Sequence, residues 1–263
     1  MQNDNTTTAT NDKKTDNKSI NKSIINDNNQ SLEHKYPTKR GVWGVIAKNV
    51  FLLLTAITTD MKVIGRENFP IDNPYVVASN HQCFADGVLI VKYLPRGHFK
   101  YMCCLAASDL ETNYGWLGRL IMRVGRGIAV DRFGNPVRGL IKAKKEVEQG
   151  NICFVFPEGT RTSDGLLGEF KDGAAYLAVK SKKPLVPVYI SGAYEVWPRS
   201  SKYPNPYKGF LKRKKIRIFV GKPLLGEDYG NDAHTLTEAL SKWMNEMQDK
   251  YRNPDEAAKL TNT

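Results

Sequence analysis

Short apolar runs alternate with helical patterns along most of this chain, and that alternation limits the possible folds more than any other feature. The runs have the length and composition of buried strands. They are Tyr75–Ala78, Lys100–Leu105, Gly127–Val130, Ile152–Phe156, Leu185–Ile190 and Ile216–Val220. Helical patterns lie at 86–93, 136–149, 173–181 and 235–251. Strands that alternate with helices predict a single α/β domain with a mixed, largely parallel sheet flanked by helices.

Capping residues predict where two of these helices begin and end. Asn135 precedes Pro136, which suits a first helical position, and Gly150 follows the end of the same helix. Thr235 and Glu238 have the spacing of a capping box, which predicts the start of the final helix. The apolar residues of that helix share one face, as expected for core packing: Leu236, Leu240, Trp243, Met244, Met247 and Tyr251.

Composition divides the chain into four parts. Residues 1–36 are mostly Asn, Thr, Lys, Asp and Ser, too polar to offset the entropy of ordering, so a disordered tail is predicted. We expect an interfacial helical segment at 37–62, the α/β domain at 63–253 and a C-terminal tail at 254–263. No secretory signal is predicted, because an apolar run is missing from the start of the chain.

The apolar stretch Val42–Ile57 is predicted to be a helix. Sixteen helical residues span about 24 Å, less than a hydrocarbon core of roughly 30 Å. Its less apolar positions form one narrow stripe, and basic residues flank it on both sides: Lys35, Lys39, Arg40, Lys62 and Arg66. This pattern favours an amphipathic helix on an anionic membrane surface. A helix packed on the domain core fits nearly as well, and a spanning helix fits least.

The chain is strongly basic, with a formal charge of +12 and a pI of about 9.4. An anionic partner is therefore expected, whether nucleic acid, an acidic membrane or a phosphorylated substrate. The basic run Lys212–Lys215 is not surrounded by a nucleic-acid-binding module, so membrane steering or a solvated loop is the better interpretation. The four cysteines lack metal-ligand spacing, which predicts free thiols in a reducing compartment and no metal.

The segment Asn80–Gly87 carries the sharpest motif. It follows a predicted strand and opens a helix, a position from which side chains project at the end of a sheet. Histidine is suited to remove a hydroxyl proton near neutral pH, and a carboxylate can hold its second nitrogen. Residues five apart on a helix are about 140° out of line, so His81 and Asp86 can meet only if His81 lies in the preceding turn. Alone, the pair could equally be a capping histidine beside a surface aspartate.

Three further segments are informative mainly in combination. Phe156–Arg161 ends a strand and turns through Pro157 and Gly159, which would present backbone N–H groups and an arginine to a phosphate. Alone, it could be a salt-bridged loop. Gly127–Arg132 is a strand that ends in an acid–base pair, and Pro184–Ile190 is an apolar strand with two prolines. Each of these two is, by itself, compatible with a structural role.

In content and order, the four segments resemble the motif blocks of the glycerolipid acyltransferase family, lysophosphatidic acid acyltransferase type. Asn80–Gly87 is similar to its block of histidine, four residues and aspartate, and Phe156–Arg161 to its phenylalanine-proline-glutamate-glycine block. Gly127–Arg132 is similar to its glycine-to-arginine block, and Pro184–Ile190 to its valine-proline-valine block. The resemblance runs from about residue 42 to 224 and is highly specific, because four motifs occur in order.

The resemblance implies roles for individual residues. His81 would deprotonate an acceptor hydroxyl, which then attacks an acyl thioester, and Asp86 would orient His81. An acceptor phosphate would be bound nearby by Arg132, Glu158, Gly159, Thr160, Arg161 and Lys171. No covalent acyl-enzyme, cofactor or metal is expected, so Cys83 within the first motif is interpreted as a bystander.

The implied activity is transfer of a fatty acyl chain from acyl-CoA or acyl-carrier protein to a lysophospholipid such as 1-acylglycerol 3-phosphate. We expect it at the cytoplasmic face of an anionic membrane, in phospholipid biosynthesis, without nucleic acid as a partner. Alternatives are the same chemistry on a lyso-aminolipid or glycerol 3-phosphate, thioester hydrolysis, and lipid binding without catalysis.

One position departs from the family pattern. Members that bind phosphate acceptors usually carry a lysine after the strand between the first two blocks, where this chain has Ala107. Losing one charge-assisted contact would weaken phosphate binding by roughly 1.5–3 kcal/mol. Either another base such as Lys100 or Arg126 substitutes, or the acceptor is not lysophosphatidic acid.

Overall fold

The computed structural model describes residues 42–260 except 73, 132–133 and 211, so the predicted tail at 1–36 lies outside the described residues. The strands are β1 (Asp60–Ile64), β2 (Val76–Ser79), β3 (Met102–Ala107), β4 (Gly127–Val130), β5 (Ile152–Val155), β6 (Leu185–Ser191) and β7 (Lys215–Val220). The helices are α2 (Val42–Thr58), α3 (Asp86–Val91), α4 (Leu110–Gly125), α5 (Val137–Glu148), α6 (Gly173–Ser181), α7 (Ala193–Val196), α8 (Ala233–Tyr251) and α9 (Pro254–Leu260). Short 3-10 helices are η1 (Arg66–Asn68), η2 (His98–Tyr101) and η3 (Gly226–Tyr229).

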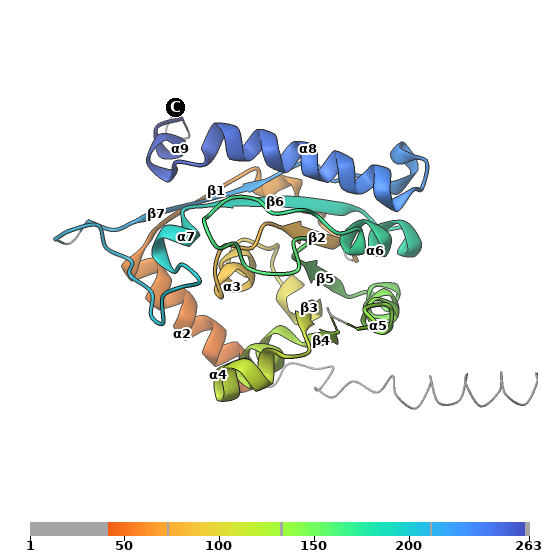
Figure 1. The fold of residues 1–263 in the computed structure, drawn as a ribbon, viewed down its shortest axis with the longest axis horizontal. Helices are drawn as coiled ribbons and strands as arrows, with labels where there is room; N and C mark the ends of the chain where they lie inside the picture. The colour runs from red at the N-terminus through yellow and green to blue at the C-terminus, as the bar shows by residue number, and fades with distance from the viewer. Residues whose placement is uncertain (1–41, 73, 132–133, 211, 261–263) are drawn as a thin grey trace, which may run out of the picture. The chain divides into compact units, whose positions relative to one another are not determined.

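The strands form a 7-stranded sheet in the order β1-β7-β6-β2-β5-β3-β4 (Figure 1). β6, β2, β5, β3 and β4 run parallel to one another, whereas β7 is antiparallel to β6 and parallel to β1. The predicted mixed, largely parallel α/β sheet is therefore confirmed. Because parallel strands end on the same side, the loops after β2, β3, β5 and β6 meet at one edge.

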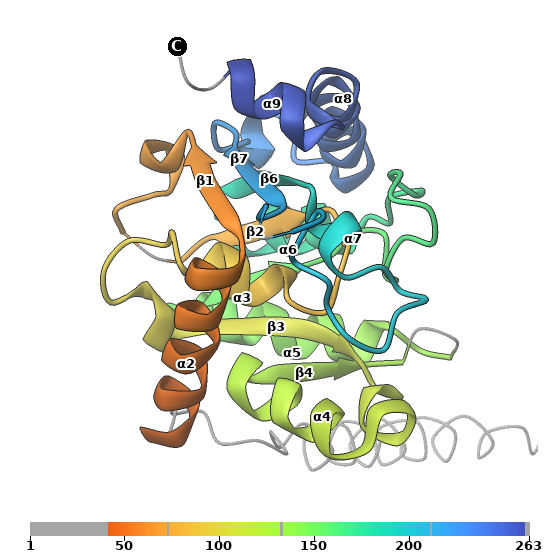
Figure 2. The same cartoon turned by 90° about the vertical axis from the view of Figure 1, so that its left-hand side faces the viewer.

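Strand side chains alternate between two cores, as the period of two requires. Val77 points into a core completed by α3 and α7, whereas Val76 and Ala78 point into a core completed by α5, α6 and α8. Figure 1 shows α8 along one face of the sheet, while α2, α3 and α4 lie on the other side. Figure 2 looks onto the side that carries α2 and α4, which contact each other. The sheet is thus covered by helices on both faces.

The predicted strands and helices are confirmed, with ends that shift by a few residues. The start of the final helix was placed wrongly: α8 begins at Ala233, and the side chain of Asp232 accepts the N–H of Thr235 at 2.8 Å. Asp232 is therefore the N-cap, because its carboxylate serves the free N–H groups of the first turn.

Both ends of the domain differ from the sequence prediction. The interfacial segment expected at 37–62 ends earlier, since Asp60–Ile64 forms strand β1 beside β7. Residues 254–260, expected to be part of a tail, form α9, in which Ala257 and Ala258 are buried and which contacts β7. Small side chains let this helix lie close to the sheet. Helices α4 and α7 also had no counterpart in the sequence prediction.

Candidate active site

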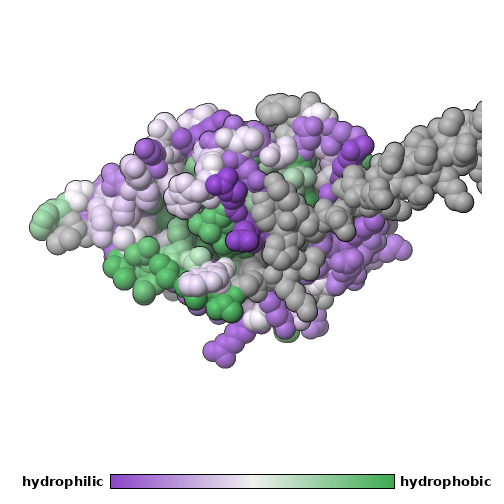
Figure 3. All heavy atoms as spheres, turned by 90° about the horizontal axis from the view of Figure 1, so that it is seen from below, coloured by the Kyte–Doolittle hydropathy of each residue, from purple (hydrophilic) through white to green (hydrophobic). Residues whose placement is uncertain are grey.

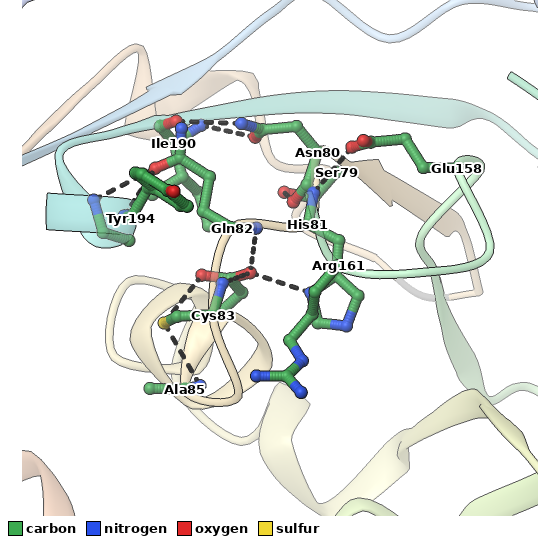
Figure 4. A network of polar contacts seen from close by, with 12 residues as sticks. Ser79, Asn80, His81, Gln82, Cys83, Ala85, Glu158, Arg161, Ile190 and Tyr194 are labelled. Carbon is green, nitrogen blue, oxygen red and sulfur yellow. Dashed lines mark hydrogen bonds and ion pairs between the residues drawn. The ribbon is translucent and has the colours of Figure 1, made fainter. Parts of the chain in front are cut away.

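The loop after β2 folds His81 back onto the first residue of α3. His81 Nδ1 lies 2.9 Å from Asp86 Oδ2, and the same oxygen accepts the backbone N–H groups of Gln82 at 2.7 Å and Cys83 at 2.8 Å. Asp86 is fully buried, whereas the His81 side chain is 20% exposed. This is the geometry required by the sequence, with His81 in the turn before the helix (Figure 4).

The hydrogen bond to Asp86 decides how the His81 ring can act. A carboxylate oxygen only accepts hydrogen bonds, so in the neutral ring Nδ1 carries the hydrogen and Nε2 keeps a lone pair. No described residue hydrogen-bonds to Nε2. The ring of Phe156 stacks on the imidazole with centroids 3.9 Å apart and planes 15° apart, which fixes its orientation. The site therefore offers one open, oriented basic nitrogen.

Glu158, in the turn after β5, joins the two loops that form the site. Its Oε1 accepts the backbone N–H of His81 at 2.8 Å, and its Oε2 accepts that of Gly168 at 3.0 Å. Burial raises the pKa of Glu158 to about 7, although these two hydrogen bonds act in the opposite direction. Both oxygens thus hold backbone groups, and the carboxylate positions the turn that carries His81.

Arg161 lies between two aromatic rings. Its guanidinium carbon lies 3.5 Å from the centroid of Phe84, and Nη2 donates to the hydroxyl of Tyr114 on α4 at 3.0 Å. The other terminal nitrogen, Nη1, is buried and has no hydrogen-bond partner. Burial lowers the pKa of the guanidinium from its ordinary value. A buried cation with a terminal N–H that lacks a partner is suited to bind an anion.

The remaining predicted phosphate ligands lie around the same turn. Thr160 is exposed, and its hydroxyl accepts a hydrogen bond from Arg199 Nη1 at 3.2 Å. Gly159 has φ +70°, and a Cβ atom there would lie 3.5 Å from Lys171 Nζ. Lys171 is exposed, and its N–H donates to the Pro157 carbonyl at 3.0 Å. Arg132 lies outside the described residues.

Several side chains that support the site were missed by sequence reasoning. Asn80 exchanges two hydrogen bonds with the backbone of Ile190 in β6, at 2.9 and 2.7 Å. Gln82 Oε1 accepts the N–H groups of Ala193 and Tyr194, so the first motif is tied to α7 (Figure 4). Tyr114 and Arg199 were missed as well. Tyrosine and arginine are common on surfaces, and only the fold brings these two to Arg161.

An α/β domain with an oriented histidine at the carboxyl edge of its sheet, beside a buried arginine, has the parts of an enzyme that activates a hydroxyl near an anionic group. The family model described as Acyltransferase matches residues 60–191, which include His81, Asp86, Glu158 and Arg161. The chain therefore belongs to the acyltransferase family, which confirms the family predicted from the motifs.

Individual relatives agree with this assignment. The chain is 30% identical to the 1-acyl-sn-glycerol-3-phosphate acyltransferase of Bacillus subtilis, over 77% of this chain and 95% of that protein. It is 32% identical to the chloroplastic 1-acyl-sn-glycerol-3-phosphate acyltransferase BAT2 of Brassica napus, over 66% of this chain but only 46% of that protein. The fold is similar to that of the 1-acyl-sn-glycerophosphate acyltransferase PlsC of Thermotoga maritima, with a TM-score of 0.62, 24% identity and coverage of 77% and 76%.

Proposed function

We propose that this acyltransferase moves a fatty acyl chain from acyl-CoA or acyl-carrier protein to the free hydroxyl of 1-acylglycerol 3-phosphate, in phospholipid biosynthesis. The observation that carries the proposal is the buried Asp86 carboxylate on Nδ1 of His81, which leaves Nε2 open at the carboxyl edge of the sheet. The names of the relatives supply the substrate class. In this acceptor, the carbon that bears the free hydroxyl is bonded directly to the carbon that bears the phosphate. The base and the phosphate site must therefore be neighbours.

In the proposed mechanism His81 Nε2 accepts the proton of the acceptor hydroxyl while the hydroxyl oxygen attacks the thioester carbonyl. Asp86 accepts from Nδ1–H throughout and stabilises the imidazolium that forms. Collapse of the tetrahedral intermediate breaks the carbon–sulfur bond, and the imidazolium returns the proton to the leaving thiolate. The products are the ester and a free thiol.

The acceptor phosphate is assigned to the turn after β5. Arg161 supplies Nη1, which has no partner within the chain, and Gly159, Thr160 and Lys171 border the same turn. Arg132 joins this set by family resemblance alone. Glu158 acts on this site indirectly, since it holds the backbone of His81. Cys83 Sγ lies 3.2 Å from Asp86 Oδ1, and burial raises the pKa of this thiol, so it remains protonated and takes no part as a nucleophile.

Helices α2 and α4 supply a surface for membrane docking in this proposal. None of the residues of α2 is buried, and its apolar side chains Trp43, Leu53 and Ile57 are more than half exposed. Trp116 of α4 is 70% exposed, and Figure 3 shows apolar side chains gathered on the side of the molecule seen from below. No described helix is long and apolar enough to span a bilayer. We propose that the exposed apolar side chains of α2 and α4 dock on the surface of an anionic membrane, with the cytoplasmic face as the expected side.

The basic run contributes less to this surface than its sequence suggests. Arg213 Nη1 donates to the carbonyl of Ala56 in α2, Lys214 Nζ donates to the carbonyl of Glu195, and Lys215 forms an ion pair with Asp255. Three cations of the run are thus bound to the chain itself. The bond from Arg213 to Ala56 holds the C-terminal end of α2 against the domain.

The test is acyl transfer from radiolabelled acyl-CoA and acyl-carrier protein to a panel of lysolipids. We expect labelled product with 1-acylglycerol 3-phosphate and a loss of roughly 10²–10⁴-fold in kcat for His81→Ala. A thermal melt that matches the wild type shows that the variant is folded. Undiminished turnover by His81→Ala, or release of free fatty acid at a rate independent of the acceptor, would contradict the proposal.

A further inference from the structure

The end of β3 lacks the cation that the family pattern places there. Ala107 is the last residue of β3, and the alternatives Lys100 and Arg126 precede β3 and β4. They therefore lie at the amino ends of parallel strands, on the edge opposite His81. Arg126 is also buried in an ion pair with Glu146 at 3.0 Å. Neither residue can replace the missing lysine at the site.

Arg199 does reach the site, from the segment that follows α7. Its Nη1 donates to the hydroxyl of Thr160 at 3.2 Å and to the carbonyl of Arg161 at 3.3 Å. One end of this guanidinium is therefore seated on the turn after β5. Arg199 is otherwise exposed to solvent. It also lies beyond the residues 60–191 that match the family model.

The charges at this turn are not balanced by the chain. Within the described residues, no carboxylate lies at ion-pair distance from Arg161 or Arg199. Arg161 is 8% exposed and leaves Nη1 without a partner. Burial, and to a smaller degree the charge of Arg199, lowers the pKa of Arg161. Two adjacent guanidinium groups repel each other unless an anion lies between them.

We propose that Arg199 is the second cation of the acceptor phosphate site and takes the place of the lysine that Ala107 has removed. The phosphomonoester would be shared between Arg161 Nη1 and the exposed side of the Arg199 guanidinium. This inference rests on the proposed function. The acceptor's phosphate is favoured over the phosphates of CoA, because a short spacer joins it to the reacting hydroxyl, whereas a long arm separates CoA phosphates from the thioester.

The experiment compares Arg199→Gln, Arg199→Lys and the control Lys202→Gln, which removes an exposed charge in the same segment. KM and kcat are measured for 1-acylglycerol 3-phosphate with acyl-CoA and with acyl-carrier protein. For Arg199→Gln we expect the acceptor KM to rise on the order of tenfold, because one charge-assisted contact is lost. We expect kcat within about twofold of wild type and unchanged donor KM. Arg199→Lys should be intermediate, and Lys202→Gln should match the wild type.

Three results would overturn the proposal. An unchanged acceptor KM removes Arg199 from the site, and a rise confined to the KM of acyl-CoA assigns it to the donor. A fall in kcat that Arg199→Lys does not restore, with unchanged KM, assigns it a structural role in the turn.

Direct binding provides a second measurement. Calorimetry with a soluble short-chain 1-acylglycerol 3-phosphate uses His81→Ala protein in the absence of an acyl donor, so that binding is measured without turnover. We expect binding to be on the order of tenfold weaker when Arg199→Gln is added. Arg199→Lys should weaken binding severalfold, and it provides the measurement if Arg199→Gln does not fold. Equal binding in the folded variants contradicts the proposal. If His81→Ala alone retains turnover, the proposed function fails instead, so the two failures are distinguishable.

Discussion

At the amino end of β4, Arg126 is buried against Glu146, whereas after β5 Arg161 is buried against the rings of Phe84 and Tyr114. Arg126 Nη2 and Glu146 Oε2 are 3.0 Å apart, and both side chains are less than 10% exposed. Arg217 of β7 follows the same rule, since its Nη2 lies 3.0 Å from Asp60 Oδ2. Arg161 is also buried, at 8% exposed, but has no carboxylate partner among the described residues.

The three arginines also differ in which guanidinium nitrogen lacks a hydrogen-bond partner. Each of these buried arginines leaves one N–H group without a partner. In Arg126 and Arg217 it is Nε, at the base of the guanidinium, while the terminal nitrogens hold carboxylate and carbonyl oxygens. In Arg161 it is the terminal nitrogen Nη1. Arg126 and Arg217 are thus neutralised by carboxylates of the chain itself, and removing such a partner is costly, whereas the charge of Arg161 is left for the anion that we propose to bind there.

The largest expected effect comes from removing the internal partner. Glu146→Ala leaves Arg126 buried and unpaired, so we expect the free energy of unfolding to fall by about 3–5 kcal/mol, measured by urea denaturation. The activity per folded molecule should be retained, because this pair lies at the edge opposite His81. The control Glu148→Ala removes the exposed partner of Lys144 on the same helix and should cost at most about 0.5 kcal/mol. Equal effects of the two variants would show that Arg126 does not need its carboxylate.

Arg161→Gln should give the opposite pattern. The variant loses the contact with Phe84 and the hydrogen bond to Tyr114, but it also removes a buried charge without a partner. We therefore expect a stability change below about 1 kcal/mol. The acceptor KM should rise roughly 10–150-fold, which corresponds to a lost contact of 1.5–3 kcal/mol. The exposed Arg138→Gln is the control for net charge. Strong destabilisation with an unchanged KM would make Arg161 structural, like Arg126.

The sequence predicted the fold class and the His81–Asp86 turn because both depend on local patterns. Apolar runs specify strands, and a five-residue spacing leaves one way for these two side chains to meet. Helix α4 escaped prediction because its pattern is interrupted: Gly115 has φ +54° and ψ −124°, a kink inside the helix. Strand β1 follows α2 at once, with only Thr59 between them, so composition did not separate the two.

Contacts between distant segments could not be predicted. Tyr114 and Arg161 are 47 residues apart, and Arg199 meets Thr160 across 39 residues. Neither pair carries a sequence pattern, because the contact arises only when parallel strands bring their following loops to one edge. For the same reason, the sequence did not indicate that the two oxygens of Glu158 hold backbone N–H groups of His81 and Gly168. Motifs identify chemical groups, but the fold decides which partner each group serves.

Glu158, three residues before Arg161 in the chain, allows a test with pH, because its buried carboxyl also forms no ion pair among the described residues. Burial raises its pKa to about 7 from 4.5, so the folded state binds a proton more tightly than the unfolded state. The associated stability is fully present below about pH 4.5 and is lost as pH rises through about 7. Between pH 5 and 7.5 we expect the wild type to lose about 1–3 kcal/mol more than Glu158→Gln, measured by urea denaturation. Parallel pH profiles would indicate that Glu158 is already ionised at pH 5.

The smallest effect is expected for Tyr114→Phe, which tests whether α4 positions Arg161. The variant keeps the aromatic ring, which packs edge-on against Phe84 with centroids 4.7 Å apart, and removes only the hydroxyl bonded to Arg161 Nη2. A hydrogen bond to a charged group is worth about 1.5 kcal/mol at the lower end of the usual range. Part of this is recovered when the guanidinium rotates toward water, so the acceptor KM should rise about three- to tenfold. The donor KM and the melting temperature should not change, and Tyr101→Phe, at another exposed tyrosine, serves as the control. A loss in kcat without a change in KM would indicate that Tyr114 acts on the His81 turn, and the assignment of Arg161 to the phosphate would then depend on Arg161→Gln alone.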